Sequence, residues 1–321
     1  MTPSAPSGPS STALDAAYRA LRGRDLVTLR ELTPEGFRAI LERARLMKAD
    51  PRAFASVLTG KTLALIFEKP SLRTRVTFDV AMYQLGGHAV YLSPAEISMG
   101  KRESTYDVAK NLERMVQGIM IRTFAQRIVE ELAAAATVPV INALTDFSHP
   151  CQGLADYLTL LEHKGRLEGL RLAYVGDGNN VVHSLAYGAA LSGAHLAVAT
   201  PADYGPAPGV VAWARDHGAA ITLTHDPREA VEGADAVYTD TWTSMGQEAE
   251  ADERRRIFKV YQVNEALFAR AKADAVFMHC LPAHRGEEVT DAVIDSPRSV
   301  VFDEAENRLH AQKAVLAALM A

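Results

Sequence analysis

The sequence predicts an α/β protein with two doubly wound domains, each built on a central parallel sheet flanked by helices. Short and almost wholly apolar segments alternate along the chain with longer segments of helical periodicity. The apolar segments lack the in–out alternation of half-exposed strands, which is typical of parallel strands covered on both faces. The length of 321 residues is about twice that of a common single domain, so we expect two domains.

Four apolar segments in the first half of the chain are predicted strands. A helix begins at Thr33-Pro34, an N-cap and first-turn pair, and its apolar residues recur at helical spacing on one face. A helix over about 73–85 ends at Gly86-Gly87, and another begins at Ser104 with an acidic residue three positions later, as in a capping box. With a further helix over 126–135, these segments separate the predicted strands 62–67, 88–91, 119–122 and 138–142.

The second half repeats the alternation and ends on a long helix. Helices are predicted across 153–163 and from 180 to 192, with others between the later strands. The predicted strands are 171–175, 195–199, 220–224, 236–239, 275–278 and a short last one at 300–302. We expect domains over 1–150 and 151–303, hinged near 143–155. The closing helix, about 304–321, could return to either domain.

Composition excludes several classes of protein. Hydrophobic residues make up 48% and charged residues 23%, which excludes a fibrous or largely disordered chain. The 34 Lys and Arg against 39 Asp and Glu give a net charge of −5, so we expect no general binding of nucleic acid or anionic lipid. Two cysteines cannot form a disulfide framework, and no apolar run is long enough to span a membrane. The first 26 residues lack the cationic segment followed by an apolar segment that is typical of a signal peptide, so we expect a cytoplasmic protein.

Polar segments follow six of the predicted strands at the point where each strand ends. Ligands of doubly wound sheets bind at the carboxyl ends of the strands, so these segments predict one site between two domains. They are Glu68–Arg75, Arg122, Asp146–Gln152, Gly176–Asn180, Asp240–Gly246 and His279–Pro282.

The segment Ser71-Leu72-Arg73-Thr74-Arg75 begins a helix directly after a strand. Free N–H groups, the positive end of the helix dipole and added Ser, Arg and Thr donors favour binding of a dianion. The glycines and terminal G-K-[ST] of a Walker loop are missing. The alternative is an ordinary N-cap with arginines in solvent.

The segment His149-Pro150-Cys151-Gln152 lies at another predicted strand-to-helix turn. A neutral imidazole can donate to a developing oxyanion, and a Gln amide can bind a small amide-like group through both N–H and C=O. The alternative is a structural histidine. No neighbouring residue orients a Cys–His nucleophile pair, which disfavours cysteine-protease chemistry.

Two segments of the second half offer groups for an amino-acid ligand. Gly176-Asp-Gly-Asn-Asn180 is a poor dinucleotide fingerprint because Val181 replaces the third glycine, and its Asn pair suits a carboxylate or amine better. Asp240 could hold an ammonium group, or it could belong to an ordinary loop. In His279-Cys280-Leu281-Pro282 we expect a partly ionised thiol at a strand end and a bend fixed by proline, unless the cysteine is inert core. Zinc is disfavoured because these residues and His284 lack a second ligand pair.

Taken together, these segments resemble the aspartate/ornithine carbamoyltransferase family. Ser71–Arg75 is similar to its S-x-R-T-R carbamoyl-phosphate loop, and His149–Gln152 to its H-P-x-Q motif. Asp240–Gly246 and His279–Pro282 resemble the D-x-x-x-S-M-G and H-C-L-P motifs of the ornithine branch. The resemblance runs from about residue 25 to the end, and Phe302–Arg308 matches the segment whose arginine closes on the phosphate.

The resemblance implies transfer of a carbamoyl group from carbamoyl phosphate to the δ-amine of L-ornithine, giving L-citrulline and phosphate. It implies arginine biosynthesis or the reverse catabolic direction, a homotrimer with sites near subunit boundaries, and no metal or organic cofactor. Ser98 stands where the family often has Gln or His in a loop that reaches the neighbouring subunit's site. The alternatives are a related amine such as putrescine or acylated ornithine as acceptor, or a nicotinamide-dependent oxidoreductase.

The resemblance also implies a role for each matched residue. The carbonyl would be polarised by Arg122, His149 and Thr74, with Cys280, steered by Asp240, near the attacking amine. The carbamoyl-phosphate residues would be Ser71, Leu72 through its backbone N–H, Arg73, Thr74, Ser98, Arg122, His149, Gln152, Cys280, the Leu281 carbonyl and Arg308. The ornithine residues would be Asn180, Asp240, Ser244 and Met245. The departing phosphate can take the proton, so no dedicated base is implied.

Overall fold

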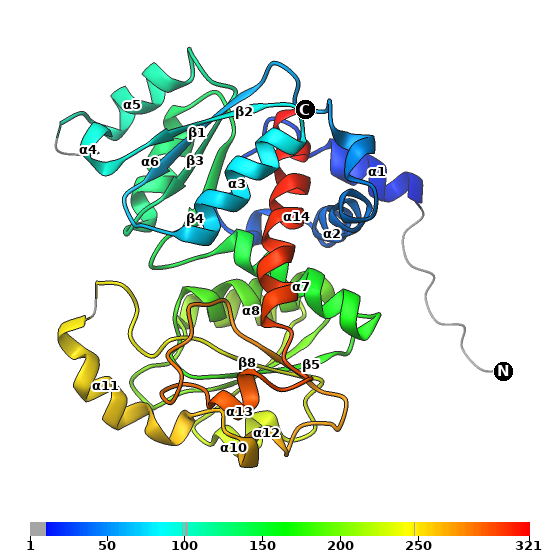
Figure 1. Ribbon diagram of the computed structural model, residues 1–321, viewed down its shortest axis with the longest axis vertical. Coiled ribbons are helices and arrows are strands. Elements are labelled where there is room, and N and C mark those ends of the chain that lie inside the picture. Colours follow the sequence, from blue (N-terminus) through cyan, green and yellow to red (C-terminus); the bar gives the residue numbers. More distant parts are fainter. Residues whose placement is uncertain (1–10, 98, 100–101, 247) are drawn as a thin grey trace.

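The computed structural model describes residues 11–97, 99, 102–246 and 248–321. Within these residues two parallel sheets form the centres of two domains, one above the other in Figure 1. This confirms the predicted fold class. No described helix is long and apolar enough to cross a membrane.

The first sheet has the strand order β2-β1-β3-β4, and all of its pairings are parallel. Its strands are β1 (Thr62–Phe67), β2 (His88–Leu92), β3 (Gly118–Arg122) and β4 (Val140–Leu144). Helices flank this sheet: α1 (Ser11–Arg19), α2 (Pro34–Ala49), α3 (Leu72–Gln84), α4 (Pro94–Ile97), α5 (Thr105–Leu112) and α6 (Gln126–Ala135). The N-caps predicted for α2 and α5 are present, since Thr33 and Ser104 accept hydrogen bonds from Gly36 N and Asp107 N.

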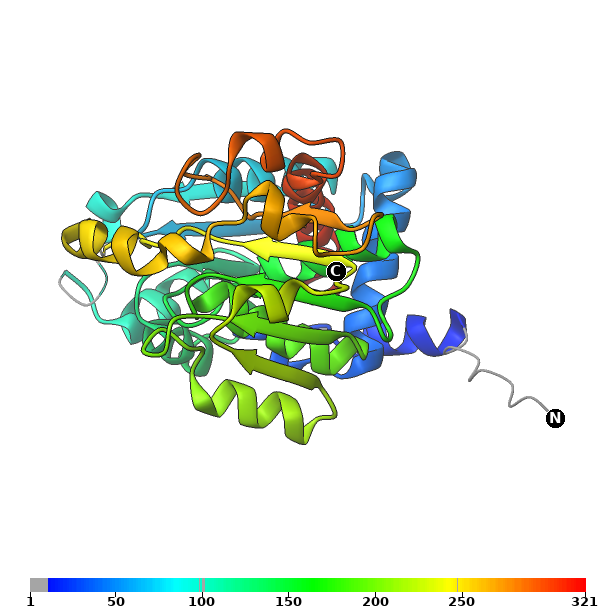
Figure 2. The same cartoon turned by 90° about the horizontal axis from the view of Figure 1, so that it is seen from below.

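The second sheet has the order β7-β6-β5-β8-β9 and is also wholly parallel (Figure 2). Its strands are β5 (Arg171–Val175), β6 (His195–Ala199), β7 (Ala220–Thr224), β8 (Ala236–Thr239) and β9 (Val276–Met278). Helix α7 (Pro150–Lys164) follows β4 and contacts it, and it also contacts α8. The helices that accompany the second sheet are α8 (Asn180–Ser192), α9 (Pro208–Asp216), α10 (Pro227–Val231), α11 (Ala251–Phe258), α12 (Glu265–Phe268) and α13 (Asp291–Ile294).

The closing helix α14 (Val301–Met320) returns to the first domain, where it packs against α2 and α3 and also against α7 (Figure 1). The prediction of a strand at 300–302 is wrong. Ser299 makes only an isolated bridge to Phe277, and the chain turns into the helix at Val301. The β-branched Val300-Val301 pair favours a strand locally, but packing of a 20-residue helix outweighs that preference.

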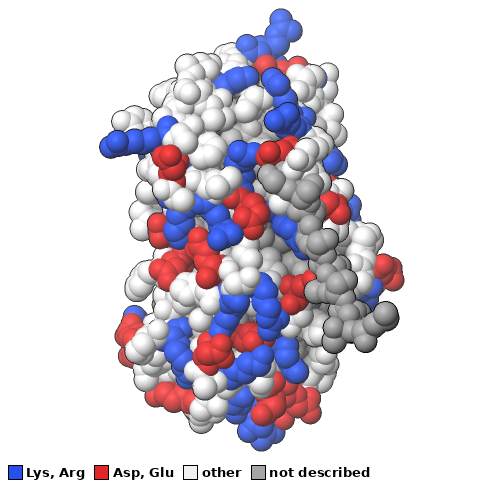
Figure 3. All heavy atoms as spheres, turned by 90° about the vertical axis from the view of Figure 1, so that its right-hand side faces the viewer, with Lys and Arg blue, Asp and Glu red and all other residues white. Residues whose placement is uncertain are grey.

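Charged side chains of both signs are interspersed over the face shown in Figure 3. That face carries no broad patch of one sign, in agreement with the slightly negative net charge. The groups that could bind an anion are instead buried between the sheets.

Candidate functional site

The predicted anion-binding turn is built as a helix N-terminus. Ser71 caps α3: its Oγ accepts a hydrogen bond from Thr74 N at 3.2 Å and donates to Thr74 Oγ1 at 3.0 Å. Leu72 is 77% exposed, so only its backbone can serve a ligand at this turn. Arg308 reaches Thr74 from α14, and its Nη2 donates to Thr74 Oγ1 at 3.2 Å. The helix terminus and a guanidinium from the far end of the chain therefore meet at one place.

Three arginines face this turn and influence one another. The pKa of Arg122, at the end of β3, is lowered to about 9 by burial and by the neighbouring charges of Arg308 and Arg73. Burial also lowers the pKa of Arg308. Arg122 Nε and Arg308 Nε have no hydrogen-bond partner among the described residues. Several buried positive charges close together, with N–H donors that lack a partner, suit the binding of a multiply charged anion.

His149 is buried and neutral beside these cations. Burial, followed by the charges of Arg308 and Arg122, lowers the pKa of His149 well below its usual range. Its backbone N–H donates to Ser184 Oγ at 2.9 Å, which fixes the turn, while Nδ1 has no described partner. The lowered pKa agrees with the neutral imidazole expected from the sequence, so His149 does not add a fourth positive charge to the cluster.

The two domains touch at a bent segment after β9. Leu281 has φ 58°, in the left-handed region that side chains other than glycine rarely adopt, and the Leu281–Pro282 bond is cis. This agrees with the expected bend. The Leu281 carbonyl accepts a hydrogen bond from Arg73 Nη2, so a residue of the first domain binds the second domain at this point.

Asp240 is the centre of a second polar cluster, at the end of β8. Its Oδ1 accepts hydrogen bonds from Cys280 Sγ at 3.0 Å and Thr241 N at 2.8 Å, and its Oδ2 accepts from Asn179 Nδ2 at 2.7 Å. The expectation of a partly ionised thiol is wrong. Burial and then Asp240 raise the pKa of Cys280 well above its usual range, so the thiol stays protonated and donates.

The ornithine-side residues predicted from the sequence are only partly brought together. Asn180 begins α8 and donates through Nδ2 to Thr145 O at 2.5 Å, whereas its neighbour Asn179 is the residue that caps α8 and holds Asp240. Ser244 is half-buried and Met245 exposed in the loop after β8. Ser98 lies outside the described residues.

Sequence reasoning missed a buried carboxyl pair next to Gln152. Gln152 Nε2 donates to Asp156 Oδ1 at 2.7 Å and to Glu304 Oε1 at 3.0 Å, and its Oε1 accepts from Arg308 Nη1 at 2.7 Å. One sequence feature pointed to Asp156: it is a lone charge in the apolar run 154–158, one helical turn after Gln152.

The possible dinucleotide turn after β5 is filled by protein. A Cβ at Gly178 would lie 2.3 Å from the carbonyl carbon of Gly205, so the loop over 204–206 packs directly on this turn. A pyrophosphate would need that space, which argues against the nicotinamide alternative.

Two groups of potential metal ligands occur among the described residues, Asp240–His279–Cys280 and His284–Glu287–Glu288. Both ring nitrogens of His279 are engaged, Nδ1 with Leu281 N at 2.8 Å and Nε2 with Glu288 Oε1 at 3.1 Å. The first group thus offers a thiol and a carboxylate already hydrogen-bonded to each other.

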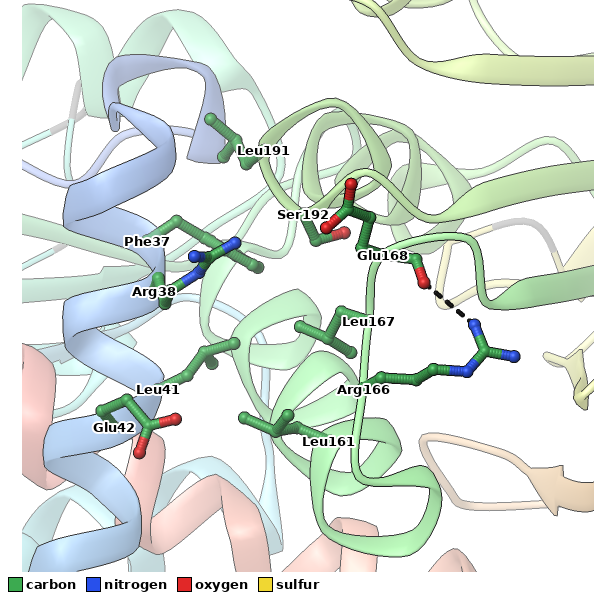
Figure 4. A pocket seen from close by; sticks show the side chains of 10 residues that line it. All are labelled: Phe37, Arg38, Leu41, Glu42, Leu161, Arg166, Leu167, Glu168, Leu191 and Ser192. Atoms are coloured by element: carbon green, nitrogen blue, oxygen red, sulfur yellow. Dashed lines mark hydrogen bonds between the residues drawn. The ribbon is translucent and has the colours of Figure 1, made fainter. Parts of the chain in front are cut away.

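A small apolar pocket of about 200 Å³ lies elsewhere, between α2, α7 and α8 (Figure 4). Phe37, Leu41, Leu161 and Leu191 line it, and Arg166 extends to the side, where its Nη1 donates to Glu168 O. It contains none of the predicted site residues.

Comparison with known proteins assigns the chain. The family model for the carbamoyl-phosphate-binding domain of aspartate/ornithine carbamoyltransferases matches residues 24–162, and the model for the Asp/Orn-binding domain matches 168–319. The chain belongs to the aspartate/ornithine carbamoyltransferase family. The resemblance carried by the sequence motifs is thereby confirmed.

Individual members of the family are similar over nearly their whole length. The ornithine carbamoyltransferase of Thermococcus kodakarensis is 56% identical, over 94% of this chain and 98% of that protein. The structure of ornithine carbamoyltransferase from Pyrococcus furiosus has a TM-score of 0.90 at 55% identity, covering 94% of this chain and 98% of that one. The Thermus thermophilus structure has a TM-score of 0.86 at 50% identity, with coverage of 92% and 99%.

Proposed function

We propose that this protein transfers the carbamoyl group of carbamoyl phosphate to the δ-amine of L-ornithine, giving L-citrulline and phosphate. The observation that carries the proposal is the meeting, across the domain boundary, of a buried arginine cluster with the Asp240–Cys280 pair. The arginine cluster suits a phosphate dianion, and the Asp240–Cys280 pair suits an amine. The names of the most similar relatives support the same reaction.

The phosphate end would bind at the start of α3. Ser71, Thr74 and the backbone N–H of Leu72 supply neutral donors there, and Arg73 and Arg308 supply charged ones. Arg73 already reaches the Leu281 carbonyl, so its guanidinium lies where phosphate and carbamoyl groups would join. These residues would hold the leaving group and stabilise the charge that develops on it.

The carbonyl oxygen would face Arg122, Thr74 and His149. Arg122 has an unpaired Nε, and a neutral His149 can donate one N–H without adding a further buried charge. Both groups are held rigidly by burial, which makes them effective for an oxyanion that exists only near the transition state. Gln152 and the Leu281 carbonyl would bind the carbamoyl NH₂ group.

The amino acid would bind on the side of the second domain, at Asp240, Cys280, Asn180, Ser244 and Met245. The neutral δ-nitrogen forms a bond to the carbonyl carbon, and the bond from that carbon to the phosphate oxygen breaks. The proton lost by the nitrogen passes to the phosphate, so neither Asp240 nor Cys280 has to remove it permanently. Asp240 would attract the ammonium form, while the protonated Cys280 thiol lies against it.

The proposal assigns carbamoyl phosphate to residues 1–150 with the returning helix α14, and ornithine to residues 151–303. The first domain holds Ser71–Thr74 and Arg122, and the second holds Asp240 and Cys280. The returning contacts of α14 with α2 and α3 support placing Arg308 with the first domain.

We also propose a cytoplasmic homotrimer. An apolar stripe along α3 is exposed, with Leu72 at 77%, Val76 at 49% and Tyr83 at 81%, next to Val90 on the edge strand β2. Such a stripe beside a sheet edge is typical of a subunit interface. Both cysteines, Cys151 and Cys280, are free thiols, which suits a reducing compartment. Light scattering of the purified protein would measure the mass of the assembly.

A single assay tests the reaction. Purified protein is given carbamoyl phosphate with ornithine, putrescine, N-acetylornithine or aspartate in parallel, and the carbamoylated products and phosphate are both quantified. We expect citrulline and phosphate in equal amounts with ornithine and at least a hundredfold lower efficiency with the other amines. Equal or higher efficiency with another acceptor, or no product with ornithine, would overturn the proposal.

A further inference from the structure

Asp156 on α7 and Glu304 on α14 form a fully buried pair of carboxyl groups behind the site. Tyr238 OH donates to Glu304 Oε1 at 3.1 Å and to Asp156 Oδ1 at 3.4 Å, while Glu304 Oε2 accepts from His279 N at 3.0 Å. Three elements far apart in the sequence, α7, β8 and α14, therefore converge on the pair. Among the described residues, the hydrogen-bond donors to the two carboxyl groups are Gln152, Tyr238 and the backbone N–H of His279, all of them uncharged.

The surroundings of the two carboxyl groups favour a protonated form of the pair. They are hydrogen-bonded to each other, and burial raises the pKa of Asp156 to about 7 and the pKa of Glu304 well above its usual range. The physical cause is desolvation together with the repulsion between two adjacent negative charges. A pair that retains a proton carries less negative charge than two carboxylates and still presents accepting oxygens to its neighbours.

Gln152 is the neighbour whose orientation the pair controls. Both hydrogens of its amide are used, since Nε2 donates to Asp156 Oδ1 and Glu304 Oε1. Its Oε1 is turned the other way and accepts from Arg308 Nη1. A flipped amide would place its oxygen against carboxyl oxygens and its NH₂ against a guanidinium, and would lose three hydrogen bonds at once.

The fixed direction matters for the ligand because carbonyl oxygens accept and NH₂ groups donate. With Nε2 occupied, the only hydrogen-bonding capacity that Gln152 retains is the second lone pair of Oε1. That lone pair suits an N–H donor. An acyl phosphate with a methyl group or a carboxylate oxygen in place of NH₂ would leave it unsatisfied.

We propose that Asp156 and Glu304 are positioning residues that lock the Gln152 amide with its oxygen toward the ligand, and so make the site selective for acyl phosphates that carry an NH₂ group. The inference rests on the proposed function, because it assumes that the carbamoyl group binds beside Gln152. It gives a reason to expect a preference for carbamoyl phosphate over acetyl phosphate, which has the same charge and a similar shape.

Binding of two matched stable probes tests the proposal without turnover. Phosphonoacetamide carries NH₂ on its carbonyl, and acetonylphosphonate carries CH₃ at the same position. Calorimetry gives the ratio of their dissociation constants for the unaltered protein, Glu304→Ala, Glu304→Gln and Gln152→Ala. Asp303→Ala, an exposed change on the same helix, is the matched control.

We expect the unaltered protein and Asp303→Ala to prefer the amide probe by at least tenfold, and Glu304→Ala and Gln152→Ala by less than threefold. Glu304→Gln should retain the preference, because its amide replaces the protonated acid. The double variant Gln152→Ala/Glu304→Ala should lose no more than Gln152→Ala alone. If Glu304→Ala does not fold, Asp156→Ala is measured in its place with the same expectation.

A preference that persists in the folded Glu304→Ala or Asp156→Ala protein, or that is lacking in the unaltered protein, would overturn the proposal. Equal weakening of both probes would also overturn it, because a merely structural role affects them alike. Failure of the proposed function is a separate result: the probes would still bind with the expected ratio while no citrulline formed from ornithine.

Discussion

Replacing Asp240 with asparagine tests the proposed amine site most directly. Asp240 is 7% exposed and accepts three hydrogen bonds, from Cys280 Sγ, Thr241 N and Asn179 Nδ2. Asparagine keeps the shape but removes the negative charge, and its NH₂ group must face at least one of these donors. The substitution therefore removes attraction for an ammonium group and breaks one hydrogen bond in the cluster.

The magnitude follows from the hydrogen bond that is lost. A hydrogen bond to a charged group contributes about 1.5–3 kcal/mol. Since each 1.4 kcal/mol corresponds to about a tenfold change, kcat/KM for ornithine should fall by about 10- to 150-fold. Carbamoyl phosphate binds at residues of the first domain, so its KM should change by less than about threefold on the same reasoning.

Initial rates of citrulline formation, with each substrate varied in turn, give both parameters. Asp203→Asn is the matched control, because Asp203 is an exposed carboxylate in the loop after β6, a strand of the same sheet. A loss confined to carbamoyl phosphate, or kinetics equal to those of Asp203→Asn, would refute the assignment of Asp240 to the amine.

Four further outcomes are expected. Arg73→Ala should lose at least about a hundredfold in kcat/KM, because a charged donor to phosphate is removed, while its circular dichroism is unchanged. Near-normal kinetics would show that this turn is only a helix cap and does not bind phosphate. Cys280→Ser should raise the KM for ornithine and leave that for carbamoyl phosphate nearly unchanged, with the buried Cys151→Ser as control. Activity should climb from pH 7 toward pH 9, because an alkyl amine with a pKa near about 10.4 supplies more neutral nucleophile there, and a flat profile would contradict this. Glu304→Gln should lose less stability than the unaltered protein as pH rises from 5 to 8 in urea denaturation. Burial raises the folded pKa of both Asp156 (to about 7) and Glu304, so stability falls as each loses its proton, and the variant retains only one of these two groups.

Most of the fold follows from local patterns in the sequence. The strands of both sheets lie within about two residues of the predicted ranges, because buried parallel strands are short apolar runs bounded by turns. The course of α14 could not be derived in this way. Val300-Val301-Phe302 favours a strand locally, and only packing against α2, α3 and α7 shows why helix is adopted from Val301 onward.

The strand-end rule indicated Arg73 and Arg122 but not every partner, since Arg308 on α14 came only from the family resemblance. Arg122 and the Ser71 cap follow directly from their positions after buried strands. It could not rank the neighbours Asn179 and Asn180, because the phase of α8 decides which side chain turns toward Asp240. Asp156 and Glu304 escaped because their meeting depends on how α7 packs against α14, and no spacing in the sequence encodes that.

The electrostatics of the site favour a dianion over a singly charged ligand. Burial, and then the charges of Arg308 and Arg73, lower the pKa of Arg122. The nearby Asp156–Glu304 pair offsets this positive charge only partly, because burial raises the pKa of both carboxyl groups and favours a protonated form of the pair. Two negative charges of a phosphate group neutralise the remaining excess. If both carboxyl groups of the pair were ionised, they would neutralise part of the arginine charge themselves, and phosphate would bind more weakly. A proton retained by the pair therefore serves both functions at once: it keeps the arginine cluster available for phosphate and keeps accepting oxygens directed at Gln152.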